Sequence, residues 1–233
     1  MRNAVDPPTA EALFDAFSRF DADDRLAVAI LTGAGGIFCA GFDLKALAVE
    51  PAGYLTEDRG PMGPTRMELG KPVLAAIEGY AVAGGLELAV WCDFRIAASD
   101  ATLGVFNRRF GVPLIDLGTV RLPRMVGQGR ALELILTGRP VKAEEALGIG
   151  LVERLVEPGS ALTETQKVAR DIAAFPQGAL RADRRSALGQ WSLSLDEAMR
   201  AEHRGGAEVL ASGEAQQGAL RFAEGRGRHG QQG

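Results

Sequence analysis

The sequence predicts an α/β protein whose C-terminal part is almost entirely helical. Between residues 26 and 105, short apolar runs alternate with glycine-containing turns and helical patterns, which is typical of strand–turn–helix units. From Gly118 onward, apolar residues recur at helical spacing, and one strand-like run at 151–156 interrupts them. We therefore expect a core over residues 1–175 and a helical, oligomer-forming region over residues 176–233, both within one domain.

The first elements alternate between helix and strand. An apolar stripe at i, i+3 and i+4 predicts a helix that begins at a Thr9 cap. The continuous apolar run Leu26–Leu31 predicts a buried strand, and a second extended piece covers residues 37–40. After a turn, a short helix is expected over residues 43–49.

The middle of the chain contains a loop and three more strands. Residues 51–70 carry three prolines and four glycines without periodicity, which predicts a mobile loop that forms either a lid or a pocket wall. The strand Val73–Ile77 follows, then a glycine-rich turn and a helix that starts near Gly84. Two short strands are expected at 94–98 and 102–105.

The C-terminal part is expected to be built from helices. Their apolar periodicity places them near residues 160–175, 178–190 and 195–224. The glycine-rich segment from Gly225 to Gly233 is expected to be a frayed tail.

Charge and hydropathy exclude several classes of protein. The chain has 30 acidic and 26 basic residues, a net charge of −4, which argues against a nucleic-acid surface. The longest uncharged run, residues 26–42, contains four glycines and is too short to span a bilayer. The N-terminus has no apolar signal segment. We expect a cytoplasmic protein without a membrane or nucleic-acid partner.

The common cofactor and nucleophile motifs are incomplete. Gly33-x-Gly35 lacks the third glycine of a dinucleotide site, because Phe38 stands there. The first glycine of a P-loop would fall on Thr65, and the GxSxG pattern of serine hydrolases is absent. Two cysteines without CxxC spacing and two late histidines offer little for a metal. We expect no metal and no separate cofactor.

Two segments share a design that suits catalysis. Residues 38–45 and 79–87 each contain the end of a strand, a glycine turn and the first turn of a helix. Amides at a helix start lack partners within the helix and lie at the positive end of its dipole. The amides of Phe42 and Gly84 could therefore converge on one carbonyl oxygen as a main-chain oxyanion hole.

Four motifs in order resemble the enoyl-CoA hydratase/isomerase (crotonase) superfamily. They are residues 31–45, residues 71–93, Gly118-Thr119-x-Arg121-Leu122-Pro123 and residues 136–152. The resemblance implies a crotonase-like spiral of ββα units with a C-terminal helical trimerisation region, and hence a homotrimer or homohexamer. It also implies an acyl-CoA thioester as substrate, in which coenzyme A is part of the substrate and not a cofactor.

The resemblance also implies roles for individual residues around the thioester. The carbonyl would lie between the amides of Phe42 and Gly84. The segment that contributes to the coenzyme A site in the family corresponds to Ala40, Asp43, Leu44 and Lys45. Asp43 could instead cap its own helix, and Lys45 could be a solvated surface residue.

The catalytic positions depart from the pattern of the family's hydratases. Glu87 matches the first of their two glutamates, although a glutamate in a first helical turn could also just complement the dipole. The second glutamate falls on Asn107, which can hold a water but cannot transfer a proton, and which could also be pocket lining. Asp116, in Asp-x-Gly-Thr, resembles an aspartate of the dienoyl-CoA isomerases, or it caps the next helix.

These departures leave three functions open. The resemblance favours an enoyl-CoA hydratase type of lyase that adds water to a 2-enoyl-CoA. An enoyl- or dienoyl-CoA isomerase that uses Glu87 and Asp116 is the alternative enzyme. A catalytically silent member that binds CoA esters is the third hypothesis.

Overall fold

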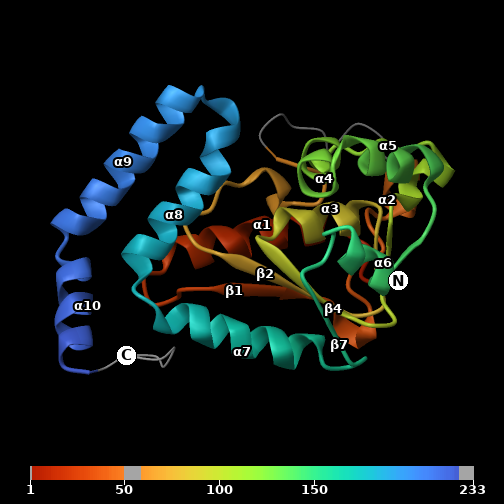
Figure 1. Ribbon diagram of the computed structural model, residues 1–233. Coiled ribbons are helices and arrows are strands. Elements are labelled where there is room, and N and C mark those ends of the chain that lie inside the picture. The colour runs from red at the N-terminus through yellow and green to blue at the C-terminus, as the bar shows by residue number, and fades with distance from the viewer. Residues whose placement is uncertain (1, 50–58, 226–233) are drawn as a thin grey trace. The chain divides into compact units, whose positions relative to one another are not determined.

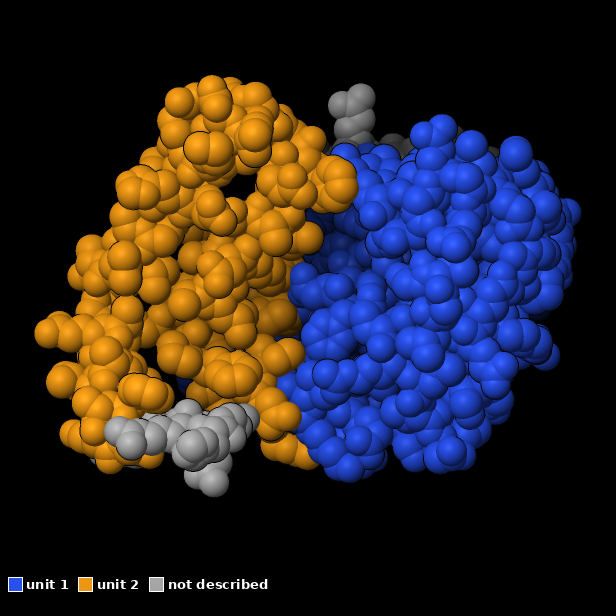
Figure 2. All heavy atoms as spheres, in the orientation of Figure 1, with its two compact units in different colours: residues 1–69, 73–169 blue, residues 70–72, 170–233 orange. Residues whose placement is uncertain are grey.

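The computed structural model describes residues 2–49 and 59–225. The chain forms two compact units, residues 1–69 with 73–169 and residues 70–72 with 170–233 (Figure 2). The first unit contains both β-sheets. The second is helical and consists mainly of α8 (Gln177–Gly189), α9 (Leu195–Ala211) and α10 (Glu214–Ala223).

The remaining elements are shown in Figure 1. They are α1 (Pro7–Ala22), β1 (Ala29–Thr32), α2 (Leu44–Val49), β2 (Val73–Ile77), β3 (Tyr80–Val82), α3 (Gly84–Trp91), β4 (Phe94–Ala98), β5 (Thr102–Gly104), α4 (Gly118–Val126), α5 (Gln128–Thr137), β6 (Val141–Lys142), α6 (Ala143–Gly148), β7 (Arg154–Val156) and α7 (Ala161–Ala174). Short 3-10 turns lie at η1 (Ala34–Gly36), η2 (Pro64–Arg66), η3 (Phe106–Phe110) and η4 (Gln190–Ser192).

The strands form two sheets, and from β2 to β5 successive strands alternate between them. The first sheet has the order β1-β2-β4-β7 and is parallel throughout, and the second has the order β3-β5-β6. After β1, an isolated parallel bridge between Cys39 and Ala81 puts the chain beside β3. Each turn of the chain thus contributes one extended segment to each sheet and then a helix. This confirms the predicted spiral of ββα units.

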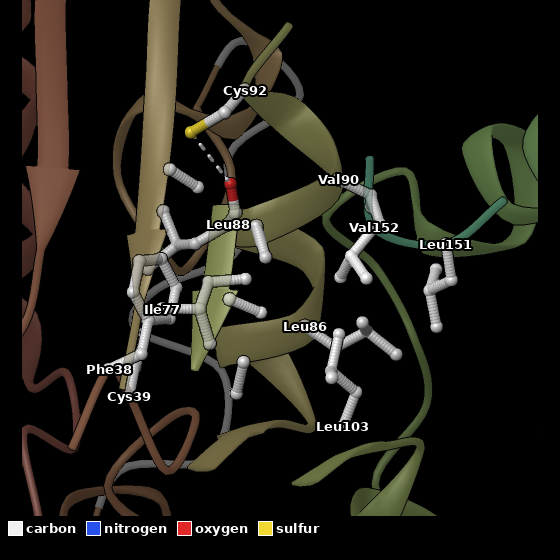
Figure 3. Packing of buried hydrophobic residues seen from close by; sticks show 14 of the residues in the cluster. Phe38, Cys39, Ile77, Leu86, Leu88, Val90, Cys92, Leu103, Leu151 and Val152 are labelled. Atoms are coloured by element: carbon white, nitrogen blue, oxygen red, sulfur yellow. Dashed lines mark hydrogen bonds between the residues drawn. The ribbon is translucent and has the colours of Figure 1, made fainter. Parts of the chain in front are cut away.

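The core of the first unit surrounds α3. All residues of this helix from Gly84 to Val90 are buried, because its sequence is apolar on nearly every face. Figure 3 shows Leu86 directed at Leu103 of β5 and Leu88 directed at Ile77 of β2. A helix packed on all sides is a rigid support for whatever its first turn carries.

Two predictions about helix ends are wrong. Asp6, not Thr9, caps α1, since its Oδ1 accepts the Thr9 amide at 3.0 Å. The two prolines that follow Asp6 fit the first helical turn, where their fixed φ is favourable and no N–H is needed. The helix expected over 195–224 is broken at Gly213, whose φ of +84° is left-handed, so that α9 and α10 are separate.

Strands and loops also differ in part from expectation. The first strand begins only at Ala29, and the glycine-rich turn after β2 contains the short strand β3. Of the predicted mobile loop, residues 51–58 lie outside the described residues, whereas residues 60–65 are buried and therefore packed. Most of the predicted tail, residues 226–233, also lies outside the described residues. Within the described ranges, no helix is both long and apolar enough to cross a membrane.

Candidate active site

Three extended segments of the first unit end next to one another. The extended segment at Cys39 is bridged to Ala81 of β3, and Ala81 is in register with Leu103 of β5. All three segments run parallel, so that their carboxyl ends meet at one edge. Except for Asp116, which comes 13 positions after Leu103, the functional residues predicted from the sequence follow these three points within a few positions.

The two segments predicted to form the oxyanion hole lie in contact where the chain leaves Cys39 and where it leaves β3. Gly41 has a φ of +98°, and a Cβ built on it would lie 2.9 Å from the Cβ of Ala83 and 3.0 Å from the backbone N of Gly84. Gly84 opens α3, where an amide has no partner within the helix. Only glycine fits at position 41, because both the φ angle and the close approach exclude a side chain.

The amide of Phe42 is oriented by the N-terminal segment. Val5 donates its N–H to the Gly41 carbonyl at 2.8 Å and accepts the N–H of Asp43 at 2.8 Å. Because successive amides of an extended chain point in opposite directions, the N–H of Phe42 points away from Val5. The Sγ of Cys39 accepts the Gly41 amide at 3.3 Å and so also fixes this turn.

Glu87 lies in the first turn of α3 and is only 3% exposed. Its Oε1 accepts two main-chain hydrogen bonds, from the amide of Asp116 at 2.9 Å and of Gly118 at 2.8 Å. Burial and then the neighbouring Asp116 carboxylate raise the pKa of Glu87 to about 8. Since both bonds go to Oε1, a proton on this carboxyl is carried by Oε2.

Asp116 is a second buried carboxyl beside Glu87. Its Oδ1 accepts the amide of Met62 at 3.1 Å and the hydroxyl of Thr65. Burial raises the pKa of Asp116, while these hydrogen bonds oppose the rise. A Cβ on Gly60 would lie 2.1 Å from Oδ1, so the chain passes very close to this carboxylate. The loop at residues 60–65 therefore packs against Asp116 directly.

Two arginines join this loop to the turn that holds Glu87. Arg121 donates to the carbonyl of Asp116 at 3.1 Å and to the carbonyl of Thr65 at 2.8 Å. Arg66 donates to the carbonyl of Ile115 at 2.9 Å. The positive charge of Arg121 also lowers the pKa of Glu87. The turn at 115–118 is thus fixed from both sides.

Asn107 follows the third strand end and is 6% exposed. It lies in η3, and its Nδ2 donates to the carbonyl of Val112 at 2.8 Å. Its Oδ1 is buried and accepts no hydrogen bond from the described residues.

The predicted coenzyme A segment follows the same turn as Phe42. The Oδ1 of Asp43 accepts the amide of Lys45 at 2.8 Å. Asp43 therefore caps its own helix, which the sequence analysis gave as the alternative to contact with coenzyme A. Leu44 and Lys45 are exposed, and Ala40 is half-buried with its amide bound to the Arg2 carbonyl at 3.1 Å. Contact of these four residues with coenzyme A stays a prediction.

Sequence reasoning missed four residues of this cluster, namely Met62, Thr65, Arg66 and Arg121. Arg121 lay within a quoted motif, Gly-Thr-x-Arg, but received no role. Met62 and Thr65 come from a segment whose prolines and glycines indicate only a loop, so no local signal pointed to their contact with Asp116.

Comparison with known proteins identifies the family. A sequence model described as enoyl-CoA hydratase/isomerase matches residues 1–232. Enoyl-CoA hydratase EchA19 of Mycobacterium tuberculosis is 36% identical over 232 residues, 97% of this chain and 87% of that protein. A carnitinyl-CoA dehydratase of Salmonella arizonae is 37% identical, over 96% of this chain and 88% of that protein.

Solved structures give the same result. A crystal structure of enoyl-CoA hydratase from Mycobacterium tuberculosis H37Rv matches with a TM-score of 0.92 and 40% identity, covering 97% of this chain and 88% of that one. The chain therefore belongs to the enoyl-CoA hydratase/isomerase family.

Proposed function

We propose that the protein is an enoyl-CoA hydratase that adds water across the double bond of a 2-enoyl-CoA. One observation carries this assignment: the buried Glu87 carboxyl, anchored through Oε1 by two amides, one helical turn from the Gly84 amide. The similar proteins named above support water chemistry, since one is named a hydratase and the other a dehydratase.

The substrate carbonyl is held by the main chain. In this proposal the thioester oxygen accepts hydrogen bonds from the amides of Phe42 and Gly84, which stabilise the enolate as charge develops. The close approach of Gly41 to Gly84 supports this placement. Ala40, Asp43, Leu44 and Lys45 then contact the coenzyme A part of the substrate.

Glu87 performs the proton transfers. As a carboxylate it takes a proton from water while the water oxygen attacks the β-carbon, and it then returns a proton to the α-carbon. Its Oε1 is occupied by two amides, so Oε2 is the reacting oxygen. A pKa near 8 makes the protonated form a ready acid and the ionised form a stronger base than an ordinary glutamate.

An enoyl- or dienoyl-CoA isomerase is the second candidate. It is favoured by the position of Asp116, whose carboxylate is buried in the same cluster and raises the pKa of Glu87. Two carboxyls could move a hydrogen between carbons of the acyl chain. The bonds of Asp116 to Met62 and Thr65 favour a supporting role for it in the hydratase.

The proposal extends to assembly and location. Large apolar side chains are exposed on the helical second unit, among them Leu195 and Met199 of α9, which suits association into a homotrimer or homohexamer. We place the enzyme in the cytoplasm, in line with the sequence expectation.

A panel of 2-enoyl-, 3-enoyl- and dienoyl-CoA esters tests this assignment, with products identified by mass spectrometry. We expect a mass increase of one water with 2-enoyl-CoA esters. Turnover of 3-enoyl or dienoyl esters to isomers of unchanged mass, without hydration of any 2-enoyl ester, would establish the isomerase instead.

A further inference from the structure

Ala83 has a backbone conformation that residues with a side chain rarely adopt. Its φ is +54° and its ψ is −128°, a combination that glycine enters freely and that the Cβ of an alanine makes unfavourable. Ala83 directly precedes Gly84, the first residue of α3, and an alanine side chain has no oxygen with which to cap a helix. The methyl group therefore costs folding free energy at a position where glycine would fit without strain.

Hydrogen bonds on both sides of Ala83 keep this strain from relaxing. Its N–H donates to the carbonyl of Gly104 at 2.8 Å, and its carbonyl accepts the amides of Leu86 at 2.9 Å and Glu87 at 3.2 Å. A change of φ or ψ would rotate one of these peptide groups and break its bonds. Because the peptide is trans, the N–H of Gly84 points opposite to the Ala83 carbonyl and hence away from α3. The strained residue thus sets the direction of the Gly84 amide.

The methyl group of Ala83 packs against the turn at Gly41. A Cβ built on Gly41 would lie only 2.9 Å from the Cβ of Ala83, so the space between the two turns is already filled by one methyl group. The amide of Val82 donates to the Cys39 carbonyl at 3.1 Å, which keeps the two segments paired up to this point. The contact of Ala83 with Gly41 comes next along both chains. It therefore limits how closely the chains approach where they carry the two amides of the predicted oxyanion hole.

We propose, building on the function proposed above, that Ala83 is a positioning residue whose methyl group holds the amides of Phe42 and Gly84 at the separation that one enolate oxygen requires. With glycine at this position, the two turns would move closer together, and the peptide before Gly84 would gain freedom to rotate. Oxyanion donors act within about 2.7–3.1 Å of the developing charge, so a small shift of either amide weakens the stabilisation of the transition state. The strain at Ala83 is the energetic cost of this preorganisation.

Replacement of Ala83 by glycine tests this role, because it removes the methyl group and the strain together. Two rates are measured, hydration of crotonyl-CoA and exchange of the α-hydrogens of butyryl-CoA in D2O, since both pass through an enolate that the amides stabilise. Ala83→Ser keeps the Cβ and is the conservative variant, and the half-buried position leaves room for a hydroxyl. Ala16→Gly, at an exposed position within α1, is the matched control for the same chemical change.

Ala83→Gly is expected to lose at least about 10-fold in kcat for hydration, with KM nearly unchanged, and to lose exchange by the same factor. Its melting temperature should rise, because glycine relieves the strain of a positive φ. Ala83→Ser should keep kcat near that of wild type. Ala16→Gly should lower the melting temperature, as glycine does within a helix, and should leave both rates unchanged. A residue that only supports the fold would not raise stability and lower the rate in one substitution.

The contact between the two turns gives an independent test. Gly41→Ala places a second methyl group against that of Ala83. The double variant Gly41→Ala with Ala83→Gly should therefore be faster than Gly41→Ala alone, because one of the two colliding groups has been removed. Losses of kcat that simply multiply in the double variant would show that the two positions do not act on the same space, and would contradict the inference.

Three further outcomes would overturn it. Wild-type kcat in Ala83→Gly means that the methyl group does not set the amides. A fall of kcat together with the melting temperature means that Ala83 acts on the fold as a whole. An Ala83→Ser variant as slow as Ala83→Gly shows that a Cβ at this position is not sufficient. A wild-type protein that exchanges butyryl-CoA but hydrates no 2-enoyl-CoA would instead refute the hydratase proposal, and the exchange rates of the variants would still decide the role of Ala83.

Discussion

At the scale of single residues, the raised pKa of Glu87 has a consequence for stability. The ordinary pKa of a glutamate is 4.5, and that of Glu87 in the folded protein is about 8, so the folded state binds this proton more tightly than the unfolded state. The contribution of Glu87 is therefore most favourable at low pH and is lost as the pH rises from about 5 to 8.

Glu87→Gln removes this dependence. Gln mimics the protonated acid and keeps an oxygen for the amides of Asp116 and Gly118. Relative to the variant, wild type should lose up to about 1.4 kcal/mol of unfolding free energy per pH unit between pH 5 and 8. Urea unfolding at four pH values measures this, and parallel pH profiles of the two proteins would contradict the buried, protonated state.

Arg121 should set the pH at which Glu87 becomes a base. Its charge lowers the pKa of Glu87, so Arg121→Gln should raise that pKa and move the acid limb of the kcat/KM profile to higher pH. Arg130→Gln, an exposed change on α5, is the control and should leave the limb in place. A lower kcat/KM with an unmoved limb would mean that Arg121 matters only for its bonds to the main chain.

At the scale of elements, the junction between Gly41 and α3 should be intolerant of any side chain. Gly41→Ala would need a left-handed φ and would collide with Ala83, so the amides of Phe42 and Gly84 should separate. Because one lost oxyanion donor costs about 10²–10³ in kcat, we expect a loss in that range.

Gly36→Ala is the matched control for this prediction. Gly36 also has a positive φ, +72°, but a Cβ there meets nothing within 4 Å. Both variants should lose about 1–2 kcal/mol of stability from the left-handed backbone. Thermal unfolding followed by circular dichroism measures the loss of stability in each variant, and crotonyl-CoA kinetics measures the loss of kcat. Backbone strain alone lowers the stability of both variants, whereas damage to the oxyanion hole lowers kcat only in Gly41→Ala. Equal kcat losses would contradict the placement of Gly41 at the site.

The elements that the sequence predicts well are those with local signals. The apolar run Val73–Ile77 and the apolar helix after Gly84 are typical patterns, and the structure has both. The contact of Thr65 with Asp116 spans 51 residues, and nothing in the local sequence encodes it. Likewise, the Cys39 bridge to Ala81 depends on the spiral and not on residue type. The family resemblance supplied Glu87 and Asn107, but the bonds that fix them emerge only from the fold.

At the scale of the whole molecule, we predict a trimer or a pair of trimers. Leu195 and Met199 lie four residues apart on α9, on one helix face, and are 77% and 56% exposed. Replacing both by Glu should shift the protein toward monomers in light scattering, whereas Arg200→Gln on the same helix should not. A wild-type protein that is monomeric at micromolar concentration would contradict the predicted assembly.

The central claim is that the Glu87 carboxyl carries out proton transfer on a CoA thioester held by main-chain amides. The most direct measurement is crotonyl-CoA turnover by Glu87→Gln, with thermal stabilisation by butyryl-CoA recorded on the same sample as a measure of ester binding. The account predicts that turnover falls by at least about 10²–10⁴ while the stabilisation persists, because the amides of Phe42 and Gly84 remain. Wild-type turnover in this variant would contradict the account.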